Sequence, residues 1–105
     1  MLSTDYPELI RKLPRFDGPF EAYQLDAAGC KVLLASYPAG TVIDVHEHDT
    51  DNVGVITKGE LLLTIDGITQ RIGAGEWYHV PANTLHAAEF PQATAEIEFW
   101  FNAPD

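Results

Sequence analysis

From Phe20 onward the chain alternates short apolar runs with turn-forming residues, which is typical of a β protein. Several of these runs alternate apolar and polar positions, the period expected of strands with one buried face. No segment after residue 19 has the apolar spacing of a helix. The pattern predicts strands at Glu21–Leu25, Lys31–Tyr37, Thr41–His46, Asn52–Lys58, Leu61–Ile65, Ile68–Ile72, Glu76–Val80, Leu85–Phe90 and Ala95–Phe101.

Turn signals between these runs favour antiparallel pairing. The dipeptide Asp66-Gly67 separates two apolar runs and is the strongest short-range signal of a hairpin, because glycine accepts the positive φ that the turn needs. Further turns are expected at Pro38–Gly40 and Gly73–Gly75. Many short strands with frequent turns predict an all-β antiparallel sandwich or small barrel. Doubling or closing the sheet also covers strand edges that would otherwise invite aggregation.

The first residues differ from the rest, and we interpret residues 1–19 as an N-terminal arm and residues 20–105 as the barrel domain. Asp5 followed by Glu8 resembles a capping box, which predicts one short helix that Pro14 ends. The arm either lies over the end of the barrel or packs on a second subunit, and the sequence leaves both arrangements open.

Composition narrows the class of protein. The 105 residues are enough for one domain with its own core. The formal net charge of −10 argues against nucleic acids and anionic membrane surfaces as partners. No apolar leader or membrane-spanning run is present in the sequence, so a cytoplasmic protein is expected. Cys30 is the only cysteine, which excludes an intramolecular disulfide and predicts a small packing residue.

Three of the four histidines form a candidate metal site. His46 and His48 lie one residue apart, so on an extended strand both side chains point to one face. Two imidazoles can hold a metal ion when a third ligand arrives, and His86 is the candidate for that ligand. Three imidazoles suit Fe, Zn, Ni, Cu or Co better than Mg or Ca, which prefer oxygen ligands. The alternative is that all three are polar residues on the barrel rim.

The two histidine-bearing stretches resemble the two motifs of the cupin superfamily. The first family motif places a glycine before His-x-His, followed by a glutamate and a second glycine. The second motif places a glycine before Pro-x-Gly, followed by a histidine and an asparagine. The first motif is matched by Gly40, His46, His48 and Gly59, with Asn52 at the glutamate position; the second is matched by Gly75, Pro81 and His86, with Asn83 replacing the glycine and Phe90 the asparagine.

This resemblance, which covers roughly Val32 to Phe101, implies a small jelly-roll barrel of two facing sheets, the cupin double-stranded β-helix. It implies that His46, His48 and His86 hold one divalent transition metal (Fe, Zn or Ni) beside a small-molecule ligand or substrate. Cupins commonly pair through their sheets, so a homodimer is expected, with the aromatic-rich C-terminal strand as the interface.

Asn52 is the informative departure from the first motif. In most metal-binding cupins the glutamate adds a negative charge to the metal, whereas an amide oxygen is a neutral ligand. Without a carboxylate, a divalent ion keeps its full charge, which weakens its retention and strengthens its Lewis acidity. Asn52 either coordinates as a fourth ligand or leaves that position to water.

The last strand offers two opposite faces. Ile97, Phe99 and Phe101 share the face that we expect in the core, whereas Glu96, Glu98 and Trp100 share the other. Glu98 is then expected on an outer, solvated face. The alternative is that it points into the interior of the barrel, called the cup below, as a general base.

The remaining candidates have weaker signals. Glu89, like Glu98, is expected on an outer, solvated face, with a general base inside the barrel as the alternative. His79 shares a face with Trp77 and is expected to be a partly buried structural residue, with a pocket role as the alternative. Phe90 and Trp100 are candidate walls of an apolar pocket.

Three functions follow from the resemblance. The expected one is a dioxygenase-like enzyme, in which ferrous iron lets O2 and an organic substrate share open positions. The alternative is a non-catalytic module that holds a small molecule or a metal ion. A sugar isomerase or epimerase is disfavoured, because phosphate binding needs basic residues and only Lys58 and Arg71 lie between the starts of the two motifs.

Overall fold

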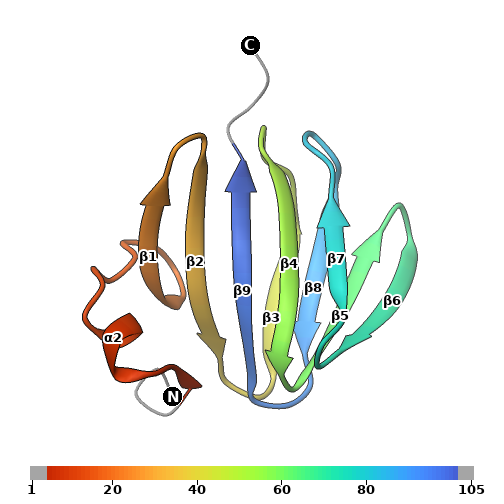
Figure 1. Cartoon of the computed structure of the whole chain (residues 1–105). Helices are drawn as coiled ribbons and strands as arrows, with labels where there is room; N and C mark the ends of the chain where they lie inside the picture. Colours follow the sequence, from red (N-terminus) through yellow and green to blue (C-terminus); the bar gives the residue numbers. More distant parts are fainter. Residues whose placement is uncertain (1–4, 102–105) are drawn as a thin grey trace.

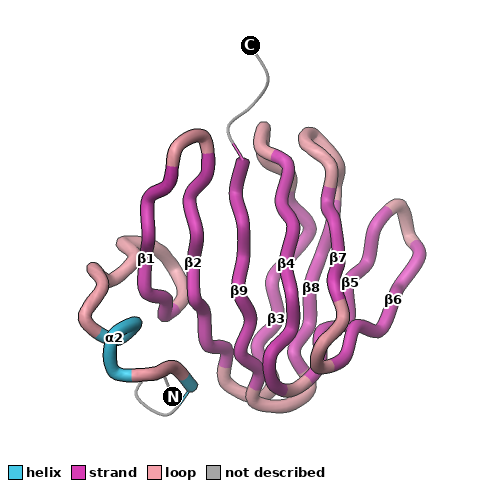
Figure 2. The backbone as a smooth tube through the Cα atoms, viewed as in Figure 1, coloured by secondary structure: helices cyan, strands magenta, loops and turns pink. Residues whose placement is uncertain are grey.

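The fold is a two-layer β sandwich preceded by a short helix (Figures 1 and 2). The structure is a computed structural model that describes residues 5–101; residues 1–4 of the predicted arm and 102–105 of the predicted barrel domain lie outside the described residues. Strand bounds agree with the predicted ranges to within two residues at either end. The elements are α2 (Glu8–Arg11), β1 (Glu21–Ala27), β2 (Cys30–Tyr37), β3 (Thr41–His46), β4 (Asp51–Lys58), β5 (Glu60–Ile65), β6 (Ile68–Gly73), β7 (Trp77–Val80), β8 (His86–Phe90) and β9 (Thr94–Phe101).

Two sheets face each other. The five-stranded sheet has the order β1-β2-β9-β4-β7, and the four-stranded sheet has the order β3-β8-β5-β6. Figure 1 shows the first sheet in front of the second. Every pairing within them is antiparallel, and β9 pairs along its length with both β2 and β4. This arrangement confirms the predicted all-β antiparallel jelly roll.

The core lies between the two sheets. The inner faces contribute large apolar side chains that are almost fully buried, so the two layers hold each other by apolar burial. The predicted hairpin joins β5 to β6, and both of its turn residues have positive φ, 52° at Asp66 and 77° at Gly67. That geometry matches the right-handed twist of paired strands. The largest fully buried apolar side chains of this core are Leu33, Ile56, Leu61, Val80 and Phe90.

The predicted cap of the helix is wrong. Helix α2 begins after Pro7 and has no side-chain cap. The Asp5 carboxylate instead accepts hydrogen bonds from Ser36 Oγ at 2.6 Å and Lys58 Nζ at 2.7 Å. Burial alone would raise the pKa of Asp5. The hydrogen bonds from Lys58 and Ser36 and the charge of Lys58 together outweigh burial, so the pKa of Asp5 lies below its usual value. A lysine charge is a stronger partner for a carboxylate than the amides of a four-residue helix.

Tyr6, Ile10 and Leu13 of the arm pack on the outer face of the five-stranded sheet of the same chain, whereas Phe16 packs against the core between the sheets. Tyr6 packs with Tyr23 and Leu34 in a second apolar cluster, separate from the core between the sheets. The Tyr6 hydroxyl lies 2.7 Å from Ala35 O and 2.8 Å from Glu96 O, and it donates to this pair of carbonyls. The arm is therefore anchored at the junction of β2 and β9.

The predicted faces of the last strand are exchanged. Glu96, Glu98 and Trp100 point between the sheets, whereas Ile97, Phe99 and Phe101 lie on the outer face, so the prediction that these three form the core is wrong. Strand β9 is central in its sheet, and the arm covers part of its outer face. A strand with apolar neighbours on both faces gives no clear inside from alternation alone.

The anchor of the arm can be tested by removing one hydroxyl. The variant Tyr6→Phe leaves the carbonyls of Ala35 and Glu96 without their donor and should lower the free energy of unfolding by about 1–2 kcal/mol. Chemical denaturation measures this change. Tyr23→Phe is the control, because its ring packs edge-on against Tyr6 at 6.3 Å and the variant keeps that packing. Equal stability of Tyr6→Phe and wild type would contradict the anchor.

Candidate metal centre

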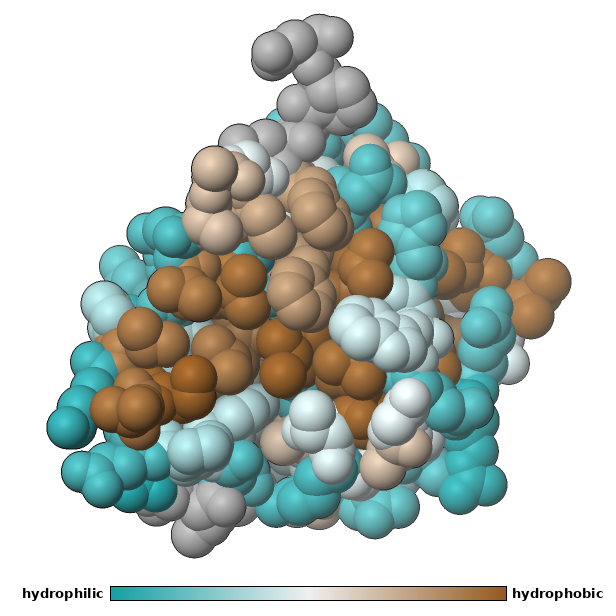
Figure 3. All heavy atoms as spheres, in the orientation of Figure 1, coloured by the Kyte–Doolittle hydropathy of each residue, from teal (hydrophilic) through white to brown (hydrophobic). Residues whose placement is uncertain are grey.

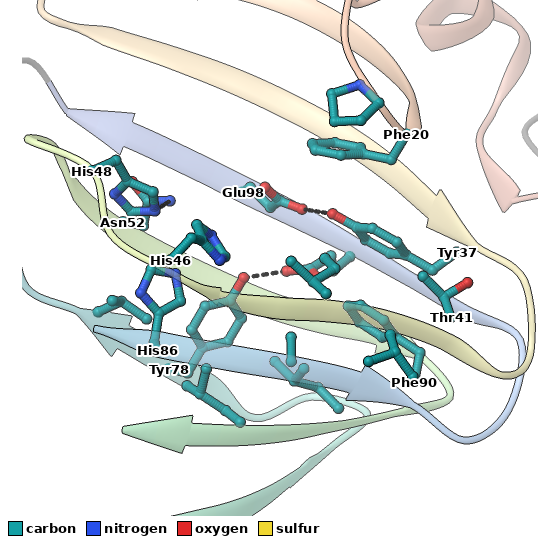
Figure 4. Close-up of a pocket in the computed structure, with 18 of the residues that line it drawn as sticks. Phe20, Tyr37, Thr41, His46, His48, Asn52, Tyr78, His86, Phe90 and Glu98 are labelled. Carbon is teal, nitrogen blue, oxygen red and sulfur yellow. Dashed lines mark hydrogen bonds between the residues drawn. The ribbon is translucent and has the colours of Figure 1, made fainter. Parts of the chain in front are cut away.

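Three histidines from separate segments converge at one end of the space between the sheets (Figure 4). His46 ends β3, His86 begins β8 and the two are direct partners across the sheet, whereas His48 lies in the loop before β4. One ligand nitrogen from each ring lies within 4.8 Å of the others. The convergence predicted from the sequence is therefore present.

A bulge in β3 turns His46 inward. Ile43 packs against the core, so strict alternation would send Val45 inward and His46 outward. The register against β8 shifts between Ile43 and His46, and Val45 is 65% exposed. His48 lies beyond the end of β3, so the shared strand face predicted for the two histidines is not the reason that they meet.

A main-chain carbonyl orients the imidazole ring of each of the three histidines. Each Nδ1 lies within hydrogen-bonding distance of a carbonyl two residues away, which places the ring proton on Nδ1 and leaves Nε2 as a lone-pair donor. The donor set therefore fits a divalent transition metal. The pairs are His46 with Asp44 O at 2.8 Å, His86 with Thr84 O at 2.8 Å and His48 with Thr50 O at 3.3 Å.

The electrostatics of the cluster keep His86 neutral. Burial lowers the pKa of His86 below its usual value, because a charged imidazole is poorly solvated there. The hydrogen bond to Thr84 O raises this pKa, and the neighbouring rings of His46 and His48 lower it again. A neutral ring is the form that binds a metal ion.

Two loop contacts join the motifs. Asn83, which replaces the glycine of the second family motif, has a φ of 60°, a left-handed conformation that asparagine tolerates better than most residues. Its amide N–H donates to His48 O at 2.7 Å. The amide of Ala82 donates to Asp51 Oδ1 at 3.1 Å. The loop that ends at His86 thus positions the segment that carries His48.

Asn52 borders the histidine cluster. Its side chain is buried, with Nδ2 3.3 Å from His48 Nε2, and its Oδ1 accepts a hydrogen bond from Thr50 Oγ1 at 3.0 Å. Turning the amide over exchanges the places of its nitrogen and oxygen. An amide oxygen can therefore be presented to the cluster from this position.

A cavity of about 550 Å³ extends from the histidines between the two sheets, within the range of small-molecule sites. Its far end is aromatic: the rings of Tyr37 and Phe90 stack at 4.0 Å, and Phe20 from the arm side lies 5.2 Å from Tyr37. Figure 4 shows this aromatic group at the opposite end of the cavity from the histidines. Phe90 and Trp100 both line the cavity, as predicted.

Comparison with known proteins decides the family. Residues 33–100, well over half of the chain, match the family described as the cupin domain. This chain is a cupin. The H2HPP isomerase of Bacillus subtilis is 31% identical over 78 residues, a match that covers 73% of this cupin and 33% of the relative. The cupin thus spans about a third of the length of that curated relative.

Solved structures agree on the fold. An RmlC-like cupin from Shewanella frigidimarina superposes with a TM-score of 0.77 at 21% identity, covering 90% of this cupin and 88% of that chain. A cupin superfamily protein from Desulfitobacterium hafniense gives a TM-score of 0.73 at 17% identity, covering 93% and 95%. At these identities the likeness concerns the fold alone. Among the described residues of this cupin, no helix is long and apolar enough to span a bilayer.

Two carboxylates inside the cup are the residues that sequence reasoning placed least well. Glu98 is 5% exposed and Glu96 2%, and both line the cavity, so the expected solvated outer face of Glu98 is wrong. Burial raises the pKa of both carboxyls, and the charge of Glu98 raises that of Glu96 further. The available signal was that both share a strand face with Trp100, which was predicted to line a pocket.

The remaining candidates lie outside the cup. His79 is exposed rather than partly buried, and its Nε2 lies 3.2 Å from Asp51 Oδ1. It points away from the cavity because its neighbours Tyr78 and Val80 face inward. Glu89 is exposed and does not line the cavity. Cys30 is half-buried at the start of β2.

The buried acids should make stability fall as pH rises. Their pKa values are higher in the folded protein than the ordinary 4.5, so the folded state binds more protons above about pH 4.5 and loses stability as pH rises through the raised values. Glu96→Gln keeps an acceptor for Tyr78 and removes one ionisable group. Its free energy of unfolding at pH 8 should exceed that of wild type by on the order of 1–3 kcal/mol.

Thermal or denaturant unfolding between pH 4 and pH 8 measures this difference, which should shrink toward acidic pH. Glu89→Gln is the matched control, because it makes the same chemical change at an exposed position of the same cupin. A pH dependence of Glu96→Gln identical to that of wild type would show that the acid is not buried in solution.

Proposed function

We propose that this cupin holds one divalent transition metal at His46, His48 and His86 and acts on a small organic molecule in the adjoining cavity. The observation that carries the proposal is the convergence of one ring nitrogen from each histidine, with each Nδ1 already beside a main-chain carbonyl, at the end of a cavity of about 550 Å³. Bound there, an Fe, Zn or Ni ion supplies Lewis acidity toward a carbonyl or hydroxyl oxygen.

Asn52 is proposed as a fourth, neutral ligand. Its amide already lies beside His48 Nε2, and Thr50 is placed to stabilise either orientation of the amide, since a hydroxyl both donates and accepts. A set of neutral ligands does not compensate the charge of the ion. The ion is therefore held less tightly than by a set with a carboxylate, and it polarises a bound substrate more strongly.

The proposed ligand is uncharged and partly apolar. Among the described residues that line the cavity none is Lys or Arg, so a phosphate group has no counter-ion there. Lys58 and Arg71, the basic residues weighed from the sequence, form ion pairs with Asp5 and Glu60. The aromatic end of the cavity suits a ring or an alkyl group, and oxygen donors at the other end of the ligand would lie near the histidines.

Two reaction classes are compatible with such a centre. A dioxygenase-like reaction needs open metal positions for O2 and substrate, which three histidines leave. An isomerisation by proton transfer needs one substrate and a base, and the Bacillus relative is named as an isomerase. A non-catalytic binding module would use the same cavity and convert nothing.

Metal content is the first test. Protein purified without a metal-affinity column should contain Fe, Zn or Ni by elemental analysis. His86→Ala should lower metal affinity by more than about 100-fold, since loss of an outer-shell partner alone costs roughly 10–100-fold. His79→Ala is the matched control because His79 lies outside the cluster. Asn52→Glu should tighten binding by adding a charge. Equal losses in His86→Ala and His79→Ala would contradict the proposed site.

The loaded protein then separates the reaction classes. O2 uptake with a diketone, a thiol or a catechol would assign the dioxygenase-like reaction. Conversion without O2 uptake would assign an isomerase, and tight retention of an unchanged ligand would assign the binding module.

We also propose that the cupin forms a homodimer through the outer face of its five-stranded sheet. Figure 3 shows apolar side chains gathered on this face over β1, β2, β9 and β4. Across the strands Leu25 pairs with Val32, Val32 with Phe99 and Phe99 with Val53, which forms a continuous apolar row. Exposed apolar surface of this kind marks interaction sites.

Sedimentation velocity tests the dimer. Phe99→Lys places a charge at the centre of the apolar row and should shift the protein from dimer to monomer. Val42→Lys is the control, because Val42 is 62% exposed on the other sheet. A wild-type protein that stays monomeric at high micromolar concentration would refute the interface.

A further inference from the structure

Two carboxyl side chains occupy the middle of the cup. Glu96 and Glu98 lie two residues apart on β9, so both point from the same face of this central strand into the cavity. Figure 4 shows Glu98 between the histidine end of the cavity and Tyr37 at the aromatic end. Trp100 links the two regions: its ring centroid lies 4.9 Å from that of His48, and its Nε1 donates to Glu98 Oε1 at 2.9 Å.

The two carboxyls have unequal surroundings. Glu98 accepts two hydrogen bonds, one from Trp100 and one from the Tyr37 hydroxyl at 2.6 Å. Glu96 accepts one side-chain hydrogen bond, from the Tyr78 hydroxyl. Donors stabilise a carboxylate, so Glu98 is the better site for the negative charge and Glu96 is the better site for a proton.

A glycine makes room for one of these donors. Tyr78 is the direct partner of Gly54 across β4 and β7, and Gly54 is in turn the direct partner of Glu98 across β4 and β9. A Cβ atom at position 54 would overlap the Tyr78 ring. Tyr78 therefore lies across the bare backbone of β4 and reaches Glu96 on the next strand.

No lysine or arginine lies beside the pair among the described residues that line the cavity. The other titratable groups of this lining are Tyr37 from β2, Asp44 from β3, Tyr78 from β7 and the three histidines at the end of the cavity. Burial raises the pKa of both tyrosines well above their usual value, so both remain hydroxyl donors. Burial raises the pKa of both carboxyls and the charge of Glu98 raises that of Glu96 further, so the second carboxyl is harder to ionise than the first.

We propose that Glu98 is the general base of the cup and that it moves a proton between two carbons of a neutral carbonyl compound, with Glu96 retaining the proton of the pair. The inference rests on the proposed function, because the substrate must lie in the cavity beside the histidines. It assigns the reaction class to isomerisation by proton transfer.

The step is balanced without a co-reactant. The Glu98 carboxylate takes the proton from the carbon next to the carbonyl, and the electron pair of that C–H bond forms the C=C bond of an enolate. Return of the proton from Glu98 to another carbon of the delocalised system completes the isomerisation. Substrate and product have the same composition, so no oxidant or reductant is needed. A carboxylate whose basicity is increased by burial is suited to this task near neutral pH.

The shared proton is tested first, without metal or substrate. In full-length protein labelled with carboxyl-13C glutamate, NMR at pH 7 should show one protonated glutamate side chain. Its signal should disappear in Glu96→Gln and persist in Glu98→Gln, with a lower titration midpoint because the neighbouring charge is gone. Two ionised or two protonated carboxyls in wild type would overturn the proposal. This result does not depend on the metal, so it stands apart from the metal-content test above.

Proton transfer is tested on zinc-loaded protein with 2-hydroxyacetophenone and 1-phenylpropane-1,2-dione. These neutral ketones combine adjacent oxygens with an aromatic ring. Proton NMR in D2O follows exchange of the C–H groups beside the carbonyl. Wild type should accelerate exchange, and Glu98→Gln should lower the rate by about 10²–10⁴-fold with an unchanged zinc content. Glu89→Gln, on the exposed face of β8, should exchange at the wild-type rate.

The variant Tyr37→Phe tests the role of Glu98 as a base through the pH profile of exchange, which a purely structural role of Glu98 would leave unchanged. It removes one donor to Glu98, so the pH of half-maximal exchange should rise. Exchange by Glu98→Gln at the wild-type rate would overturn the assignment of the base. Failure of zinc-loaded wild type to accelerate exchange on either ketone would overturn it too, whereas the proposed metal site would still stand on its metal content.

Discussion

The candidate metal centre depends on one contact that is made three times: a main-chain carbonyl two residues away holds the Nδ1 of each imidazole. These contacts place the ring proton on Nδ1 and leave Nε2 as the lone-pair donor, and one ring nitrogen from each histidine lies within 4.8 Å of the others. Because the acceptors belong to the backbone, these three contacts do not require a particular side chain at Asp44, Thr50 or Thr84. The loop contact from Asn83 to His48 O adds a tie between the two motif segments.

Local chemistry made the strands predictable. Turn residues such as Asp66-Gly67 and the period-two pattern depend on neighbours in sequence, so the strand ranges and the hairpin followed directly. The convergence of the histidines followed from spacing together with the family resemblance. The bulge before His46 did not, because it is a register shift against β8, and no local signal in β3 marks it. The inward face of β9 was also misjudged, because this central strand has apolar residues on both sides.

The buried carboxyls of Glu96 and Glu98 lower the stability of the fold while supplying groups that can transfer a proton. Apolar side chains at these two positions would pack between the sheets without the cost of burying ionisable groups, which burial makes harder to ionise. The sheet compensates in part, since three side-chain donors reach the pair and no described buried polar side-chain atom lacks a partner. From the opposite face, Tyr6 secures the main chain of Glu96, so the arm stabilises the strand that carries the pair.

The position of Trp100 has an optical consequence. Its indole ring packs on His48 and donates to Glu98, so its emission will respond both to a metal ion bound by the histidines and to the charge of the carboxylate. The chain has two tryptophans, and the other, Trp77, is 60% exposed on the outer face of the sheet. Replacing Trp77 with phenylalanine leaves a protein whose fluorescence comes from one indole, and that indole lies against the cup.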